Sequence, residues 1–199
     1  MPDAAPDPFP QAGAPGVPDV PEPPHGETLA SRRGFDGAHL HLRVDTVRLP
    51  SGTVRPREVL EHPGAVAIVG VTPEREVLLI RQWHHPIGRS LLGLPAGTRE
   101  PGEAQEATAR RELREETGFE AAGLRLLADY FTSPGWTDER MTVWLATDCR
   151  QVGDVANPDE LIRVARVPLA AVPDLVAPGP RQLADGKTLV GLLLLLREG

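Results

Sequence analysis

The chain has 199 residues, a length that suits a single domain, and 40% of them are hydrophobic, which is enough to form a packed core. The 21 Lys and Arg residues against 28 Asp and Glu residues give a formal net charge of −7. This balance argues against a protein that binds nucleic acid through a basic surface. A small anionic substrate remains compatible with it, because a metal ion can supply the positive charge.

The chain carries one cysteine, Cys149, so no disulfide can form within it, and this fits a reducing compartment. The longest aliphatic stretch, residues 189–196, is shorter than the roughly 20 residues that a helix needs to cross a bilayer. The N-terminus lacks the basic flank and the apolar run of a signal peptide. We therefore expect a cytoplasmic protein that does not associate with a membrane.

Proline is concentrated at the start of the chain, where nine of the 22 prolines fall within the first 24 residues. Residues 1–27 contain almost no large apolar side chains, so they cannot bury enough surface to offset the loss of chain entropy on folding. We expect residues 1–30 to form a disordered, proline-rich tail.

A short hairpin is predicted next. Residues 40–44 alternate between apolar and polar side chains, which is typical of a strand, and residues 50–52 (Pro-Ser-Gly) form a turn signal. A second strand over residues 57–60 completes the hairpin. Residues 31–62 are therefore expected to form a separate N-terminal β-hairpin subdomain.

The remaining residues, 63–199, predict a mixture of strands and helices in one domain. Two short apolar runs, residues 65–71 and 77–82, are typical of strands buried on both faces. Further strands are expected at residues 124–130, 141–147 and 161–167, and helices at residues 103–117, 169–176 and 187–197. Because Gly118 follows the first helix in the usual left-handed capping position, that helix should end there. The expected fold class is α/β (α+β), with a mixed β-sheet sandwiched between helices.

The predicted helix over residues 103–117 gathers four carboxylates on one side. Glu112 and Glu116 are four residues apart, Glu115 is three from Glu112, and Glu103 returns near the same side nine residues earlier. A solvated face with an ion pair between Arg111 and Glu115 is the simplest interpretation. Two local conflicts argue against it, because like charges four residues apart cost roughly 0.2–0.5 kcal/mol and the last turn of a helix prefers cations.

A bound divalent cation would remove both conflicts. Mg²⁺ and Mn²⁺ take oxygen ligands and commonly bridge carboxylates to the phosphates of a substrate. Such an ion polarises a phosphoryl oxygen and lowers the pKa of a bound water. The residues therefore indicate metal-assisted cleavage at a phosphate.

Residues 97–119 resemble the Nudix box at every specified position. The pattern is Gly, five residues, Glu, seven residues, Arg-Glu, an aliphatic residue, any residue, Glu-Glu, any residue, Gly and an apolar residue. Members of this family hydrolyse nucleoside diphosphates linked to another moiety. The resemblance implies that Mg²⁺, or Mn²⁺, is held by Glu112, Glu115, Glu116 and the backbone carbonyl of Ala96. It also implies that Arg111 braces the glutamates, and that Gly97, Glu103 and Gly118 shape the loop and helix.

The flanking sequence is similar to the ADP-ribose pyrophosphatase subgroup. The run Leu-Pro-Ala-Gly at residues 94–97 enters the box as it does in that subgroup, and Pro134 lies 15 residues beyond Phe119 in a loop that resembles its substrate loop. In the subgroup an acid of this loop is the catalytic base, which implies Glu139 first and Asp138 second. The resemblance implies catalytic roles for Glu139, Glu115, Glu116 and Arg111, and substrate contacts from Arg57, Glu58, Arg81, His84, Pro134 and Trp136.

Two positions depart from the subgroup pattern. His84 stands where the subgroup usually has an arginine, and an imidazole clamps phosphate more weakly than a bidentate guanidinium does. Gly93 stands where the subgroup tends to carry a glutamate. Either change is compatible with a different second moiety on the substrate, such as another nucleotide sugar.

The resemblance implies hydrolysis of a nucleoside diphosphate sugar, with ADP-ribose to AMP and ribose 5-phosphate as the leading reaction. The alternatives are another diphosphate, such as coenzyme A, a dinucleoside polyphosphate or an oxidised nucleoside triphosphate, and a module that binds ADP-ribose without cutting it. A homodimer is also implied, in which the hairpin at residues 38–60 packs across the partner, so that Arg57 and Glu58 reach the partner's site.

Overall fold

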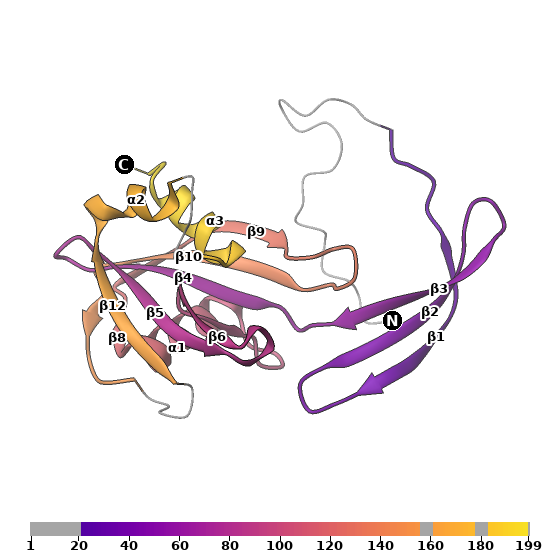
Figure 1. The fold of residues 1–199 in the computed structure, drawn as a ribbon, viewed down its shortest axis with the longest axis horizontal. Helices are drawn as coiled ribbons and strands as arrows, with labels where there is room; N and C mark the ends of the chain where they lie inside the picture. The colour runs from indigo at the N-terminus through magenta and orange to yellow at the C-terminus, as the bar shows by residue number, and fades with distance from the viewer. Residues whose placement is uncertain (1–20, 156–160, 178–182, 199) are drawn as a thin grey trace.

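The computed structural model describes residues 21–155, 161–177 and 183–198. They form two parts, a three-stranded antiparallel sheet and a larger mixed sheet flanked by helices (Figure 1). The three-stranded sheet runs in the order β1-β2-β3 and projects from the rest of the molecule. Its strands are β1 (Glu27–Asp36), β2 (His41–Arg48) and β3 (Val54–Glu61).

The larger sheet has seven strands, with the order β12-β5-β4-β10-β9, β6 paired with β5 and β7 paired with β4. β4 and β10 run parallel and the other pairs are antiparallel, so the sheet is mixed as expected. Its strands are β4 (Ala65–Val71), β5 (Glu76–His84), β6 (Arg89–Gly93), β7 (Ala96–Thr98), β9 (Gly123–Phe131), β10 (Arg140–Thr147) and β12 (Ile162–Pro168). A small pair joins β8 (Phe119–Glu120) to β11 (Arg150–Gln151).

Helices cover both faces of this sheet (Figure 1). The helix α1 (Gln105–Thr117) lies on one face, and α2 (Val172–Val176) and α3 (Gly186–Leu195) lie on the other. Short 3₁₀ turns occupy His85–Ile87 and Leu169–Ala171. None of the helices in the described ranges is long and apolar enough to cross a membrane.

β4 shows why the sheet needs helices on both sides. Val66 and Ile68 pack with Leu113 of α1, while Ala67 and Val69 pack with Leu192 of α3. Successive side chains of a strand point to opposite faces, so an unbroken apolar run must be covered twice. The predicted sandwich of a mixed sheet between helices is confirmed.

The N-terminal part differs from the sequence prediction. The structure has three strands instead of a two-stranded hairpin, and β1 begins at Glu27, within residues 1–30 that were expected to be a disordered tail. All ten residues of β1 are exposed, so no apolar alternation marked it, and its backbone pairing with β2 defines it. Residues 1–20 of the predicted tail lie outside the described residues.

The strands β6 and β7 were also missed, because the prolines and glycines around them indicated a loop. The 3₁₀ turn after β5 ends at Gly88 with a positive φ of 60°, and this reversal lets β6 pair back along β5. The first helix ends as predicted, because Gly118 adopts a φ of 76° and its N–H bonds to the carbonyl of Arg114.

Candidate active site

The guanidinium of Arg111 is the centre of the acidic side of α1. Its Nε and Nη2 each donate to the Glu103 carboxylate at 3.0 Å, and its Nη1 donates to Glu112 Oε1 at 2.7 Å and to Glu115 Oε2 at 3.0 Å. Nη2 also donates to the carbonyl of Thr98 in β7 at 3.2 Å. One cation therefore compensates three carboxylates and ties the helix to the neighbouring strand.

The contacts between Arg111 and the carboxylates stabilise the ionised form of each partner. The hydrogen bonds from Arg111 lower the pKa of Glu103 to about 2, against an ordinary value of 4.5. The bonds from Arg111 to Glu103, followed by those to Glu112 and Glu115, raise the pKa of the guanidinium. The backbone N–H of Glu100 and the Thr108 hydroxyl complete the contacts of the Glu103 carboxylate, at 3.2 and 2.9 Å.

The glutamates on the buried side of α1 lie against β7. Glu116 Oε2 accepts the backbone N–H of Ala96 at 2.7 Å, and both Glu112 and Glu116 are buried. A Cβ atom at position 97 would overlap the Glu112 carboxylate, so Gly97 leaves the space that this carboxylate fills. The helix and the strand can approach this closely only with glycine at that position.

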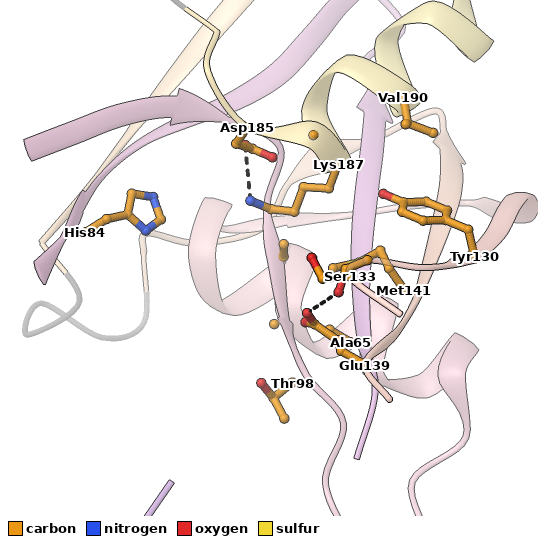
Figure 2. A pocket seen from close by; sticks show the side chains of 14 residues that line it. Ala65, His84, Thr98, Tyr130, Ser133, Glu139, Met141, Asp185, Lys187 and Val190 are labelled. Atoms are coloured by element: carbon orange, nitrogen blue, oxygen red, sulfur yellow. Dashed lines mark hydrogen bonds and ion pairs between the residues drawn. The ribbon is translucent and has the colours of Figure 1, made fainter. Parts of the chain in front are cut away.

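A cavity of about 690 Å³ has β7 as one of its walls (Figure 2). Its volume is in the range of small-molecule sites. Ala96, Gly97 and Thr98 line it, whereas the α1 glutamates lie behind them. The other lining residues are Ala65, His84, Tyr130, Thr132, Ser133, Glu139, Met141, Asp185, Gly186, Lys187 and Val190.

The loop between β9 and β10 supplies Glu139 to the cavity. Its Oε2 accepts the Thr132 hydroxyl at 2.6 Å, across the base of the loop. The neighbouring Asp138 does not line the cavity, and its carboxylate instead accepts the backbone N–H of His62 at 2.8 Å. The structure therefore separates two adjacent acids, one facing the cavity and one fastening the loop.

The start of α3 forms the opposite side of the cavity, where Lys187 and Asp185 enter (Figure 2). Asp185 caps the helix by accepting the Thr188 N–H at 3.1 Å, and it pairs with Lys187 Nζ at 3.1 Å. Burial, followed by the charge of Lys187, lowers the pKa of His84 on this side, with Asp185 acting in the opposite direction. A Cβ atom at Gly93 would lie 2.6 Å from Asp185 Oδ2, so this departure from the subgroup pattern makes room for the capping carboxylate.

Several predicted substrate residues do not line the cavity of the same chain. Arg57 and Glu58 are exposed on β3, and Arg81 is exposed on β5. Pro134 and Trp136 are exposed at the tip of the loop before Glu139, with 58% of Trp136 accessible. Of the predicted substrate contacts, the structure brings only His84 to the cavity lining.

Sequence reasoning missed Tyr130, Asp185 and Lys187. A signal for the last two was present, because an aspartate before Gly-Lys-Thr and an apolar run is a helix N-cap pattern. Tyr130 carried no signal, since its position on β9 is known only when the sheet is assembled. Burial is the main reason that the pKa of Tyr130 is raised to about 12.

The acidic side of α1 fits a divalent cation in its donor chemistry. Three carboxylates and the Ala96 carbonyl are hard oxygen donors, and the cradle at Gly97 places one carboxylate directly against the strand. Within the described ranges, no three acidic, histidine or cysteine side chains converge as a ready metal site. In this structure Arg111 holds two of the three carboxylates, Glu112 and Glu115.

The mixed sheet between helices agrees with the expected fold, and in the structure an acidic helix lies behind one wall of a ligand-sized cavity. Residues 61–186 match the model of the NUDIX domain, and residues 27–60 match that of the nucleoside diphosphate sugar hydrolase N-terminal domain. The chain therefore belongs to the Nudix family.

The alignments with known relatives cover most of this chain. The ADP-ribose pyrophosphatase of Bacillus subtilis (strain 168) is 38% identical over 164 residues, which cover 81% of this chain and 88% of that protein. The ADP-ribose pyrophosphatase of Mycobacterium tuberculosis (strain ATCC 25618 / H37Rv) is 45% identical over 128 residues, 64% of this chain and 62% of that protein. A crystal structure of an ADP compounds hydrolase shares the fold, with a TM-score of 0.76, 23% identity and coverage of 90% and 96% of the two chains.

The Glu103–Arg111 pair predicts an acid-sensitive contribution to stability. Because the pKa of Glu103 is lowered in the folded state, the carboxylate stabilises the fold above about pH 4.5, and this contribution is lost as the pH falls toward 2. We expect Glu103→Gln to lower the urea midpoint at pH 7 and to reduce the fall of that midpoint between pH 5 and pH 3. The matched control is Glu106→Gln, which removes an exposed carboxylate paired with Arg110 on the same helix. Identical pH dependence in Glu103→Gln and the unmodified protein would contradict this assignment.

Proposed function

We propose that this protein is a metal-dependent hydrolase of nucleoside diphosphate sugars, with ADP-ribose, cut to AMP and ribose 5-phosphate, as its leading substrate. The observation that carries the proposal is the cavity wall at Ala96–Thr98, which is held against an acidic helix side by Arg111 and Glu116. The relatives that are ADP-ribose pyrophosphatases support this choice of substrate.

In the proposed reaction Mg²⁺, or Mn²⁺, would be held by Glu112, Glu115, Glu116 and the carbonyl of Ala96. When bound, the ion would polarise a phosphoryl oxygen and offset the negative charge that moves to the leaving phosphate. Arg111 keeps Glu112 and Glu115 close together, since their mutual repulsion would otherwise spread them.

Glu139 is the proposed general base. A water attacks one phosphorus of the diphosphate, its proton passes to Glu139, and the bond from that phosphorus to the bridging oxygen breaks. The Thr132 hydroxyl orients the carboxylate by donating to one of its oxygens. Asp138 is the weaker candidate, because its carboxylate is engaged by the backbone of His62.

The cation of Lys187 supports an anionic substrate in this cavity. The α1 glutamates and Glu139 make the region strongly acidic, and Lys187 provides a positive group on the side opposite the loop (Figure 2). His84 lines the same side, in the position where the subgroup has arginine. The exposed Trp136 is available to stack on a base or on the terminal sugar.

We also propose a homodimer in which Arg57, Glu58 and Arg81 contact substrate where two chains meet. Support comes from the three-stranded sheet, which projects from the rest of the molecule (Figure 1). Exposed apolar side chains lie on it and on its turn, including Phe35, with 58% accessible, and Leu40, with 52%. We place the activity in the cytoplasm, an inference supported by a single cysteine, Cys149, that is free and buried.

The departures at Gly93 and His84 favour one alternative, another nucleotide sugar as the preferred substrate. A non-catalytic module that binds ADP-ribose is less well supported, because the chain retains Glu112, Glu115 and Glu116. Both alternatives are resolved by the experiment that tests the proposal.

That experiment incubates the protein and Mg²⁺ with ADP-ribose, other nucleotide sugars, coenzyme A and a dinucleoside polyphosphate, and identifies the products. We expect AMP and ribose 5-phosphate from ADP-ribose, with kcat lowered roughly 10²- to 10⁴-fold in Glu139→Gln and in Glu116→Gln. Asp138→Asn should retain more activity than Glu139→Gln, and Glu106→Gln should match the unmodified protein. Tight binding of ADP-ribose without turnover would contradict the proposal, as would full activity of either glutamate variant.

The dimer is tested by sedimentation equilibrium. We expect the mass of two chains, with Phe35→Asp shifted to the monomer and losing activity, because a charge would be placed in a buried apolar contact. The control is Val152→Asp, which changes a side chain of similar exposure, 53%, outside the three-stranded sheet. A monomeric unmodified protein with full activity would contradict both the dimer and the shared site.

A further inference from the structure

The acid proposed as the base has a histidine neighbour that lies outside the Nudix box. His62 belongs to the segment between β3 and β4 that joins the two sheets. We propose that His62 is a positioning residue for Glu139, and that its imidazole Nε2–H holds the carboxylate oxygen left free by Thr132. This inference rests on the proposed function, since it assumes that Glu139 accepts the proton of the attacking water.

The joining segment and the loop before β10 are fastened together by backbone contacts. The N–H of Leu60 donates to the carbonyl of Trp136 at 2.9 Å, and the hydroxyl of Thr137 donates to the carbonyl of Leu60 at 2.8 Å. The N–H of His62 donates to Asp138 at 2.8 Å. These bonds fix the position of the His62 main chain relative to the main chain of Glu139, one residue beyond Asp138.

The ring of His62 is oriented by a second contact. The backbone N–H of Gly64 donates to His62 Nδ1 at 3.1 Å, so Nδ1 is the acceptor and the ring proton of the neutral imidazole belongs on Nε2. Gly64 holds this geometry with a φ of 93°, a conformation that favours glycine. A proton on Nδ1 of the neutral ring would oppose the Gly64 N–H, which disfavours the other tautomer.

Nε2 faces the carboxylate. It lies 3.9 Å from Glu139 Oε1, and both side chains are largely shielded from solvent, with accessibilities of 21% and 27%. This separation suits a contact that one bridging water or a small ring rotation completes. Glu139 Oε2 already accepts the Thr132 hydroxyl of the loop, so Oε1 is the oxygen that faces the joining segment.

A general base works only when its oxygen is held within hydrogen-bonding reach of the attacking water, and an error of 1 Å costs about 100-fold in rate. One hydrogen bond from Thr132 fixes only one oxygen of the Glu139 carboxylate and leaves the carboxylate free to rotate about this contact. A donor on the second oxygen removes this freedom, and His62 is the side chain placed to provide it.

Two substitutions separate the role of Nε2 from that of Nδ1. In His62→Asn the amide can still accept the Gly64 N–H, but no atom replaces Nε2. In His62→Gln the longer amide can place an N–H near the former Nε2 position. We expect His62→Asn to lower kcat roughly 10- to 100-fold with KM changed less than about twofold, and His62→Gln to recover most of the loss. Glu139→Gln with His62→Asn should be no slower than Glu139→Gln alone.

A readout independent of hydrolysis accompanies the kinetics. Nitrogen NMR of the whole protein should find the His62 proton on Nε2, and Glu139→Gln should shift that resonance. Unmodified kcat in a folded His62→Asn, equal losses in both His62 variants, or a proton on Nδ1 would overturn the inference while leaving the proposed function intact. An unmodified protein that cuts no diphosphate would overturn the proposed function instead, and the NMR shift would then still decide whether His62 contacts Glu139.

Discussion

The shared hold of Arg111 on three carboxylates is the interaction on which the site depends. Glu112 and Glu115 on α1 and Glu103 just before it would repel one another, and the last turn of that helix already carries the negative end of its dipole. Their hydrogen bonds to one guanidinium hold the three carboxylates in a compact cluster, and the same guanidinium donates to the carbonyl of Thr98. The charges are therefore concentrated beside β7, the strand that forms one wall of the cavity.

The remaining architecture brings separate parts of the chain to that strand. The loop before β10 supplies Glu139, and the start of α3 supplies Lys187. Thr188 links α3 to the run that leads into β7, because its hydroxyl accepts the N–H of Leu94 at 2.8 Å while donating to Asp185. The three-stranded sheet is also connected to the site, since β3 continues into the segment between β3 and β4, which is hydrogen-bonded to the loop before β10.

Sequence alone could predict the features that depend on local spacing. The clustering of Glu112, Glu115 and Glu116 on α1, the end of that helix at Gly118 and the doubly buried β4 follow from periodicity and from one capping glycine. The helix begins at Gln105, so Glu103 precedes the helix that was predicted to contain it. The edge strand β1 could not be predicted, because its exposed side chains carry no pattern. The contacts of Asp185 with Gly93 and of His62 with Glu139 join residues about 90 and 77 positions apart, so they depend on how the sheet and α3 pack. Arg57, Glu58 and Arg81 match the subgroup, but the single chain places them outside its own cavity.

The most direct measurement is a calorimetric titration of the protein with Mn²⁺, comparing the unmodified chain with Gly97→Ala. A Cβ atom at position 97 would displace the Glu112 carboxylate, whereas one at Gly135 would meet no atom within 4 Å, so Gly135→Ala is the control. If the glutamates behind β7 form a divalent-cation site, the unmodified chain and the control bind Mn²⁺ with equal affinity, and Gly97→Ala binds at least about tenfold more weakly. An unmodified chain that binds no Mn²⁺, or a Gly97→Ala variant with undiminished affinity, would contradict the account.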